Sequence, residues 1–238
     1  MLLRLYDLAG ADADRCFSPY CWRIRMALAH MGLPVETIPW RFTEKDAIAR
    51  SSQTRVPVLV DGERWIADSW QIANYLEDTY PERATLFGGP VGRALSRLYS
   101  GLGDALVSRI FGFVALDVLR HVDDRDREYF RRSREERVGM TLEALVADRD
   151  NRLGQFRQEL APLRLTLNAQ NFLGGDRPLY ADYAMFGPFH WARCISPFAL
   201  LAADDPIASW RERLLDAFEG LARKSPGYDI PAAADRRR

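Results

Sequence analysis

The chain has 238 residues, of which 47% are hydrophobic and 28% are charged, and these proportions exclude a largely disordered protein. Its 33 basic and 33 acidic residues cancel, so the net charge gives no general attraction to nucleic acid or to an anionic membrane. No stretch approaches the roughly 18 apolar residues of a membrane span, and residues 1–10 lack the apolar run of a signal peptide. The cysteines are odd in number and irregularly spaced, which excludes a disulfide framework and predicts a reducing cytoplasm.

The first third of the chain alternates strand-like and helix-like segments. Apolar runs that fit buried strands fall in four places: 2–8, 35–40, 56–60 and 65–66. Asp61-Gly62, between the last two runs, predicts a hairpin turn. One helix is predicted to open at Ser18-Pro19 and another at Asp68-Ser69, because each start has a capping side chain. The predicted order is therefore β-α-β followed by β-β-α.

From about Pro90 onward, helical spacing replaces the strand signals. Five helices are predicted, over 91–119, 125–147, 153–168, 180–201 and 206–223. We therefore predict an α/β domain over 1–82, a linker over 83–89, an all-helical domain over 90–230 and a loose tail over 231–238.

Ser18 stands at a predicted helix start, a position that can bind an anion. The free N–H groups and the dipole at a helix start stabilise an anion placed beside this serine, and its hydroxyl can donate a hydrogen bond to a thiolate. The alternative interpretation is that Ser18 only caps its helix. In the same way Ser69 can offer its hydroxyl and backbone N–H groups to a carboxylate, or serve with Asp68 as a plain cap.

The Val56-Pro57 pair precedes a predicted strand. A cis bond there would expose the backbone of Val56 as a docking edge for a peptide-like ligand, whereas the alternative is an ordinary edge proline. Each of these motifs alone fits a structural role. Their order within one β-α-β, β-β-α unit resembles the glutathione-binding domain of the glutathione S-transferases. The stretch 172–183 likewise resembles the loop and helix start at the centre of that family's helical domain.

The resemblance implies a thioredoxin-like first domain, a helical second domain, a cytoplasmic homodimer, and glutathione as co-substrate without a metal. It assigns the glutathione site to seven residues: Ser18, Tyr20, Arg55, Val56, Pro57, Asp68 and Ser69. Ser18 would hydrogen-bond the sulfur and act as the catalytic residue, and the Val56 backbone would pair with the cysteinyl part. Arg55 would lie near the glycyl carboxylate, while Asp68 and Ser69 would hold the γ-glutamyl end.

At a finer level, four runs resemble bacterial enzymes that use glutathione to cleave β-aryl ethers in lignin breakdown, and their fungal relatives. These runs are 17–23, 67–70, 126–129 and 191–193. The implied activity is attack of a glutathione thiolate on a hydrophobic, aromatic electrophile, by conjugation or ether cleavage, in detoxification or aromatic compound metabolism. One departure concerns Asp182, which would fix a helix start. Leu179 stands where the family has a capping Ser, Thr or Asn.

Three aromatic residues are candidates for the electrophile pocket between the domains: Phe111, Phe113 and Trp191. Their alternative role is the helical core. Tyr6 and Tyr20 are rival hydroxyl donors to the thiolate.

Two other functions stay open, a non-catalytic ligand- or protein-binding module and a thiol–disulfide reductase. The reductase is disfavoured because serine replaces the leading cysteine of a glutaredoxin-like motif and Cys21 falls inside the helix. The three histidines, His30, His121 and His190, share no metal-binding spacing.

Overall fold

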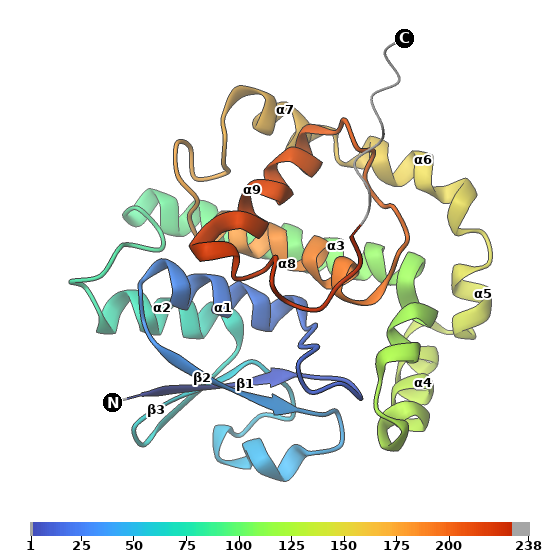
Figure 1. The fold of residues 1–238 in the computed structure, drawn as a ribbon, viewed down its shortest axis with the longest axis horizontal. Helices are drawn as coiled ribbons and strands as arrows, with labels where there is room; N and C mark the ends of the chain where they lie inside the picture. Colours follow the sequence, from blue (N-terminus) through green and yellow to red (C-terminus); the bar gives the residue numbers. More distant parts are fainter. Residues whose placement is uncertain (1, 230–238) are drawn as a thin grey trace.

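The structure is a computed structural model that describes residues 2–229, and the predicted tail over 231–238 lies outside the described residues. It consists of a four-stranded sheet layered against a group of helices (Figure 1). Helices α1 (Pro19–His30) and α2 (Ser69–Thr79) lie between the sheet and the helices of the second part. A short 3-10 helix, η1 (Lys45–Ser51), lies on the other face of the sheet and was not predicted from the sequence.

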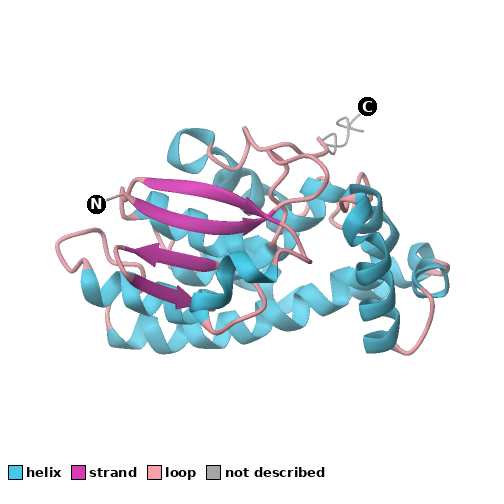
Figure 2. Ribbon diagram, turned by 90° about the horizontal axis from the view of Figure 1, so that it is seen from below, coloured by secondary structure: helices cyan, strands magenta, loops and turns pink. Residues whose placement is uncertain are grey.

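The sheet has the strand order β2-β1-β3-β4. Its strands are β1 (Leu3–Leu8), β2 (Val35–Trp40), β3 (Val58–Asp61) and β4 (Arg64–Ala67). β2 runs parallel to β1, as a crossover through α1 requires. β3 runs antiparallel to β1, and β4 runs antiparallel to β3, so β3 alone points the opposite way (Figure 2). β3 begins at Val58, directly after Pro57, because Pro57 has no N–H for the ladder. The Val56–Pro57 bond is cis.

Within the described residues, the second part of the chain consists of helices joined by loops, without a strand. Its helices are α3 (Pro90–His121), α4 (Asp124–Val138), α5 (Leu142–Val146), α6 (Arg149–Glu159), α7 (Ala161–Ala169), α8 (Tyr180–Ile195) and α9 (Pro206–Gly220). The fold prediction, an α/β thioredoxin-like domain followed by an all-helical domain, is confirmed. The boundaries at 82 and 90 stay predictions, since they fall within the connection between α2 and α3.

Three of the predicted helices are wrong in extent. The helix predicted over 125–147 divides at Gly139, which has a φ of 74° and ends α4 in the left-handed region that glycine tolerates. The helix over 153–168 divides into α6 and α7 because Pro162, in the first turn of α7, has no N–H to continue α6. The helix over 180–201 ends at Ile195, two residues before Pro197, which disfavours helical backbone at Ser196.

Helix α8 forms the centre of the molecule, and every one of its residues is buried. Two glycines let neighbouring backbones approach closely. A Cβ at Gly187 would lie 2.2 Å from the carbonyl oxygen of Pro19, at the start of α1, and a Cβ at Gly103 of α3 would lie 2.5 Å from the carbonyl oxygen of Ala184. Because these distances exclude a side chain, the contact of α8 with α1 of the first part depends on Gly187, and the contact of α3 with α8 depends on Gly103.

Asp7, on β1, is an acidic side chain inside this core. It is fully buried, and neither of its carboxylate oxygens has a hydrogen-bond partner among the described residues. The nearest cation is Arg25 of α1, whose Nη1 lies 3.6 Å from the carboxylate. Burial raises the pKa of Asp7 from 3.8 to about 6, despite the opposing effect of Arg25.

We expect Asp7→Asn to stabilise the protein relative to the native chain in a pH-dependent way. Between pH 4 and pH 6 the folded protein holds the Asp7 proton more tightly than the unfolded chain, so the native protein loses stability as pH rises. The stability difference between variant and native protein should therefore grow by up to about 3 kcal/mol and level off above pH 6. Urea unfolding at pH 4, 5, 6 and 7 measures it, with the exposed Asp14→Asn as control. A difference that does not change with pH would contradict the assignment.

Candidate active site

The pairing of the strands brings the three predicted motifs to the same end of the sheet. Phe17 donates its N–H to the carbonyl of Leu8, 3.0 Å away, so the loop after β1 returns to the end of that strand just before Ser18. Val58, which follows the Val56–Pro57 pair, is paired with Tyr6 on β1 and with Ala67 on β4. Asp68 and Ser69 follow Ala67 directly. The end of β1, the start of β3 and the end of β4 therefore meet where α1 and α2 begin.

Ser18 caps α1 as its sequence position predicts. Its backbone is extended and its Oγ accepts the N–H of Cys21 at 3.2 Å. The residue is 3% exposed, so the first turn of α1 shields it from bulk water. Because the Oγ acts as an acceptor in this contact, its proton remains available for donation to a second partner. The Ser18 hydroxyl can therefore cap the helix and donate a hydrogen bond to an anion at the same time.

Cys21 lies within the same turn but is poorly suited to chemistry. It is fully buried, and burial raises the pKa of its thiol well above the ordinary value, with the Asp7 carboxylate contributing in the same direction. Burial likewise raises the pKa of Cys16, and that of Cys194 to about 12. Each of these thiols is therefore held in its protonated, unreactive form.

Asp68 caps α2 from an unusual backbone conformation. Its φ is 73°, a value in the left-handed region, and its Oδ1 accepts the N–H groups of Trp70 at 2.9 Å and Gln71 at 3.1 Å. The neighbouring Ser69 is buried, and its carbonyl accepts the hydroxyl of Tyr180 on α8 at 2.9 Å. This last contact fixes the start of α2 to the centre of the helical part, and sequence analysis did not anticipate it.

The two rival tyrosines lie in different surroundings. Side chains alternate between the faces of a strand, and Asp7 points toward Arg25 of α1. Tyr6 therefore lies on the opposite face, where its ring stacks on Trp65 with centroids 5.6 Å apart. Tyr20 is on α1 itself, two residues after Ser18, and the guanidinium of Arg23 lies 4.7 Å from its ring centroid.

The candidate pocket residues separate into two groups. Phe111 of α3 and Trp191 of α8 lie with nearly parallel rings, at an interplanar angle of 9° and a centroid distance of 6.4 Å, and Phe130 of α4 completes the cluster. Phe113 packs instead on Phe156 of α6, with centroids 5.1 Å apart. Two residues along a helix correspond to a rotation of about 200°, so Phe113 points to the opposite side of α3.

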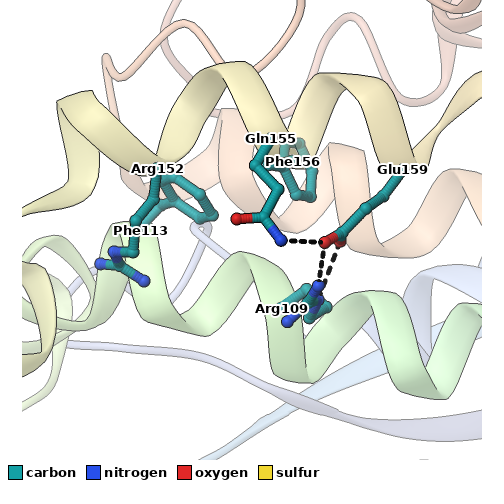
Figure 3. A pocket seen from close by; sticks show the side chains of 6 residues that line it. All are labelled: Arg109, Phe113, Arg152, Gln155, Phe156 and Glu159. Atoms are coloured by element: carbon teal, nitrogen blue, oxygen red, sulfur yellow. Dashed lines mark hydrogen bonds and ion pairs between the residues drawn. The ribbon is translucent and has the colours of Figure 1, made fainter.

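Phe113 lines a different, small pocket between α3 and α6 (Figure 3). Its lining residues are Arg109, Phe113, Arg152, Gln155, Phe156 and Glu159. The Nε of Arg109 donates to Glu159 across this pocket at 3.1 Å. The volume is about 80 Å³, whereas a cavity that holds benzene measures about 150 Å³. This space is too small for an aromatic substrate. Phe111, Phe113 and Trp191 are all buried in the helical core, at 5%, 3% and 5% exposed.

Asp126 joins the helical part to the sheet and was not singled out for this role by the sequence. It is buried in the first turn of α4, and its carboxylate accepts the N–H groups of Phe42 at 2.8 Å and Thr43 at 3.1 Å, just after β2. This contact holds α4 beside the ends of β1 and β2 (Figure 1). In the sequence, Asp126 was noticed only as the first residue of the run 126–129, one of the four runs that resemble the ether-cleaving enzymes.

Comparisons with known proteins agree with this arrangement. A family model described as "Glutathione S-transferase, C-terminal domain" matches residues 94–217, more than half of the chain, and one described as "Glutathione S-transferase, N-terminal domain" matches residues 17–79. The chain belongs to the glutathione S-transferase family.

Among curated relatives, the chain is 30% identical over 119 residues to a probable glutathione S-transferase of Glycine max, a match that spans 47% of this chain and about half (49%) of that protein. It is 28% identical over 169 residues to the maleylacetoacetate isomerase of Pseudomonas aeruginosa, over 68% of this chain and 71% of that protein.

Two solved fungal structures share the fold of this glutathione S-transferase family member. A glutathione transferase of Phanerochaete chrysosporium gives a TM-score of 0.79 at 24% identity, covering 90% of this chain and 96% of its own. A glutathione S-transferase of Ceriporiopsis subvermispora in complex with glutathione gives 0.78 at 23% identity, covering 92% and 97%. Within residues 2–229, no helix is long and apolar enough to cross a membrane, and no group of three or more His, Cys, Asp or Glu side chains is placed to hold a metal ion.

Proposed function

We propose that this family member is a glutathione transferase that binds glutathione at the sheet edge and directs its thiolate at a hydrophobic, aromatic electrophile. The observation that supports the proposal most directly is that Ser18, Val56–Pro57 and Asp68–Ser69 lie at the same end of the sheet, where α1 and α2 begin. The Ceriporiopsis subvermispora relative in complex with glutathione supports glutathione as the ligand. Arg55, exposed one residue before Val56, would reach the glycyl carboxylate, and Tyr20 would border the sulfur.

The energies available at Ser18 are sufficient for this chemistry. Lowering the pKa of a free thiol from about 8.5 by two units requires about 2.7 kcal/mol of preferential stabilisation of the thiolate. A helix start contributes roughly 0.3–2 kcal/mol, and a hydrogen bond to a charged group roughly 1.5–3 kcal/mol. Ser18 is favoured as the donor over Tyr6, because the Tyr6 ring is stacked on Trp65 on the sheet face away from α1.

The electrophile would lie beside the aromatic cluster of Phe111 and Trp191, whose nearly parallel rings are each 5% exposed. Conjugation and β-aryl ether cleavage are both attacks by sulfur on an electrophilic carbon, and they differ in the group that leaves. The four sequence runs shared with ether-cleaving enzymes support an etherase-like specificity, with Asp126 placing α4 beside the site.

Two measurements test the proposed function. Calorimetric titration should detect glutathione binding at millimolar concentrations or below, and a chlorinated nitroaromatic should be consumed only when glutathione is present. Binding without turnover would instead indicate a non-catalytic binding module. Reductase activity that disappears in Cys21→Ser would indicate a thiol–disulfide reductase, a result at odds with the burial and raised pKa of that thiol.

We also propose a homodimer in the cytoplasm. Four apolar side chains along one face of α3 are exposed to solvent: Val91, Leu95, Leu98 and Leu102. Their spacing of four, three and four residues is that of a helical seam, which a second copy could cover. The three cysteines are free, as expected in a reducing compartment. Light scattering should give twice the 27.2 kDa of one chain, and a monomeric mass at micromolar concentration would contradict the dimer.

A further inference from the structure

Two arginines of α4 lie over the aromatic cluster of the candidate site. The guanidinium carbon of Arg134 lies 5.2 Å from the ring centroid of Phe42 and 5.0 Å from that of Phe130. The guanidinium carbon of Arg137 lies 5.3 Å from the ring centroid of Phe111. Since the two arginines are three residues apart on a helix, they share one face of α4. This arginine pair therefore covers a cluster of three rings, Phe42, Phe111 and Phe130, of which Phe111 also stacks on Trp191.

Neither member of the arginine pair has a carboxylate partner within residues 2–229. Three other arginines of the same helix have carboxylate partners: Arg125 pairs with Asp123, Arg127 with Asp124, and Arg131 with Glu135 and Glu143. Among the described residues, by contrast, no carboxylate lies within ion-pair distance of Arg134 or Arg137. The exposed Arg132 has no carboxylate partner among the described residues, but it does not lie over an aromatic ring. The one polar side-chain contact of Arg134 is with the hydroxyl of Ser133, at 2.9 Å.

The environment of the arginine pair favours binding of an anion. Arg134 is half-buried, and burial, together with the positive charges of Arg137 and Arg55, lowers the pKa of its guanidinium to about 10. Arg137 and Arg55 also act on the hydroxyl of Tyr20, so these charges lie close to the start of α1, near Ser18. A half-buried guanidinium that is repelled by a neighbouring, exposed one is stabilised when a carboxylate binds between the two.

We propose that the second substrate is an aromatic electrophile bearing a carboxylate, and that Arg134 and Arg137 bind this carboxylate beside the buried aromatic cluster of Phe111 and Phe130. The inference rests on the proposed function and deepens it. In the reaction, the sulfur of glutathione forms a bond to the electrophilic ring carbon. The leaving group departs with the electron pair of the broken bond, and the carboxylate stays on the product unchanged.

Glutathione by itself does not account for these charges. It has two carboxylates, of which the glycyl one is assigned to Arg55 and the γ-glutamyl one to the start of α2 at Ser69. The arginine pair belongs to α4, in the helical part of the chain, and it contacts rings rather than the sheet edge. A further anionic group is therefore needed to match it, and the electrophile is the remaining component of the reaction.

A matched pair of electrophiles tests the inference: para-chloro-meta-nitrobenzoate and its neutral amide, each of which loses chloride to a thiolate. With rates corrected for the uncatalysed reaction, we expect kcat/KM to be about 10- to 100-fold higher for the acid. Arg134→Gln with Arg137→Gln should remove this preference while changing the amide rate and the glutathione dissociation constant less than threefold. The single Arg137→Gln variant, at an exposed position, should give part of the effect without threatening the fold.

Arg132→Gln is the matched control, because Arg132 is an exposed arginine of the same helix outside the aromatic cluster. Equal losses for acid and amide, or weaker glutathione binding in the double variant, would assign the arginine pair to glutathione and overturn the inference. So would the absence of any preference for the acid. Calorimetric binding of the acid and the amide to glutathione-free protein decides the same point even if the chain does not turn over either compound. Failure of the proposed function is thereby distinguished from failure of the inference.

Discussion

Asp182→Ala should lower the free energy of unfolding by about 3–5 kcal/mol, the largest stability loss that we expect from a single substitution of a polar residue. The Asp182 carboxylate is buried in the first turn of α8. Four donors point at it: the N–H groups of Leu173 at 2.7 Å, Gly174 at 2.9 Å and Leu179 at 3.0 Å, and the indole N–H of Trp210 at 2.9 Å. Alanine would leave these buried donors unsatisfied, and each costs about 1–3 kcal/mol with incomplete additivity.

The hydrogen bonds of Asp182 also explain why leucine can stand at the position where the family has a capping Ser, Thr or Asn. Leu179 has no side-chain acceptor, but its N–H still binds Asp182, so half of the reciprocal cap is retained. Urea unfolding measures the loss, with Asp176→Ala as the matched control, since Asp176 is exposed in the same loop and should change stability by less than about 0.5 kcal/mol. Similar effects from the two variants would show that Asp182 does not organise the start of α8.

Ser18→Ala should reduce kcat/KM with glutathione about 10- to 150-fold at neutral pH, because it removes a hydrogen bond worth roughly 1.5–3 kcal/mol to the thiolate. The same loss should raise the pKa of the bound glutathione thiol by about one to two units. The activity of the variant should therefore recover as the pH rises toward the new pKa, whereas the native enzyme reaches its plateau at lower pH. The pH–rate profile, together with the ultraviolet absorbance of the thiolate, measures both effects.

The substitution also removes a helix cap, and this contribution must be separated from the chemical one. Thr141→Ala is the matched control, since Thr141 caps α5 by accepting the N–H of Ala144 at 3.2 Å, the same distance as in the Ser18 cap. Both variants should lose about 1 kcal/mol of stability, but only Ser18→Ala should lose activity. Full activity in Ser18→Ala, combined with a large loss in Tyr20→Phe, would transfer the role of donor to Tyr20.

Much of the first domain could be predicted because its signals are local. A serine before a proline starts a helix, and Asp61-Gly62 turns a hairpin, through interactions within a few residues. The helical extents were less predictable, although Gly139 and Pro162 were visible. The helical spacing of apolar residues continues across these two positions, so the sequence pattern does not show that one helix ends and another begins there.

The amino-acid sequence by itself determined the order of the elements, the caps of α1 and α2, and the family to which the chain belongs. The tertiary structure alone decided that Phe111 faces Trp191 whereas Phe113 faces α6, and that Tyr6 lies on the far face of the sheet. It also decided that, among the arginines of α4, Arg134 and Arg137 are the two that lie over the rings of Phe42, Phe111 and Phe130. The physical reason is that the spacing of apolar residues indicates which side chains share a face of a helix. The residues that pack against that face are far away in the chain, so the spacing does not identify them.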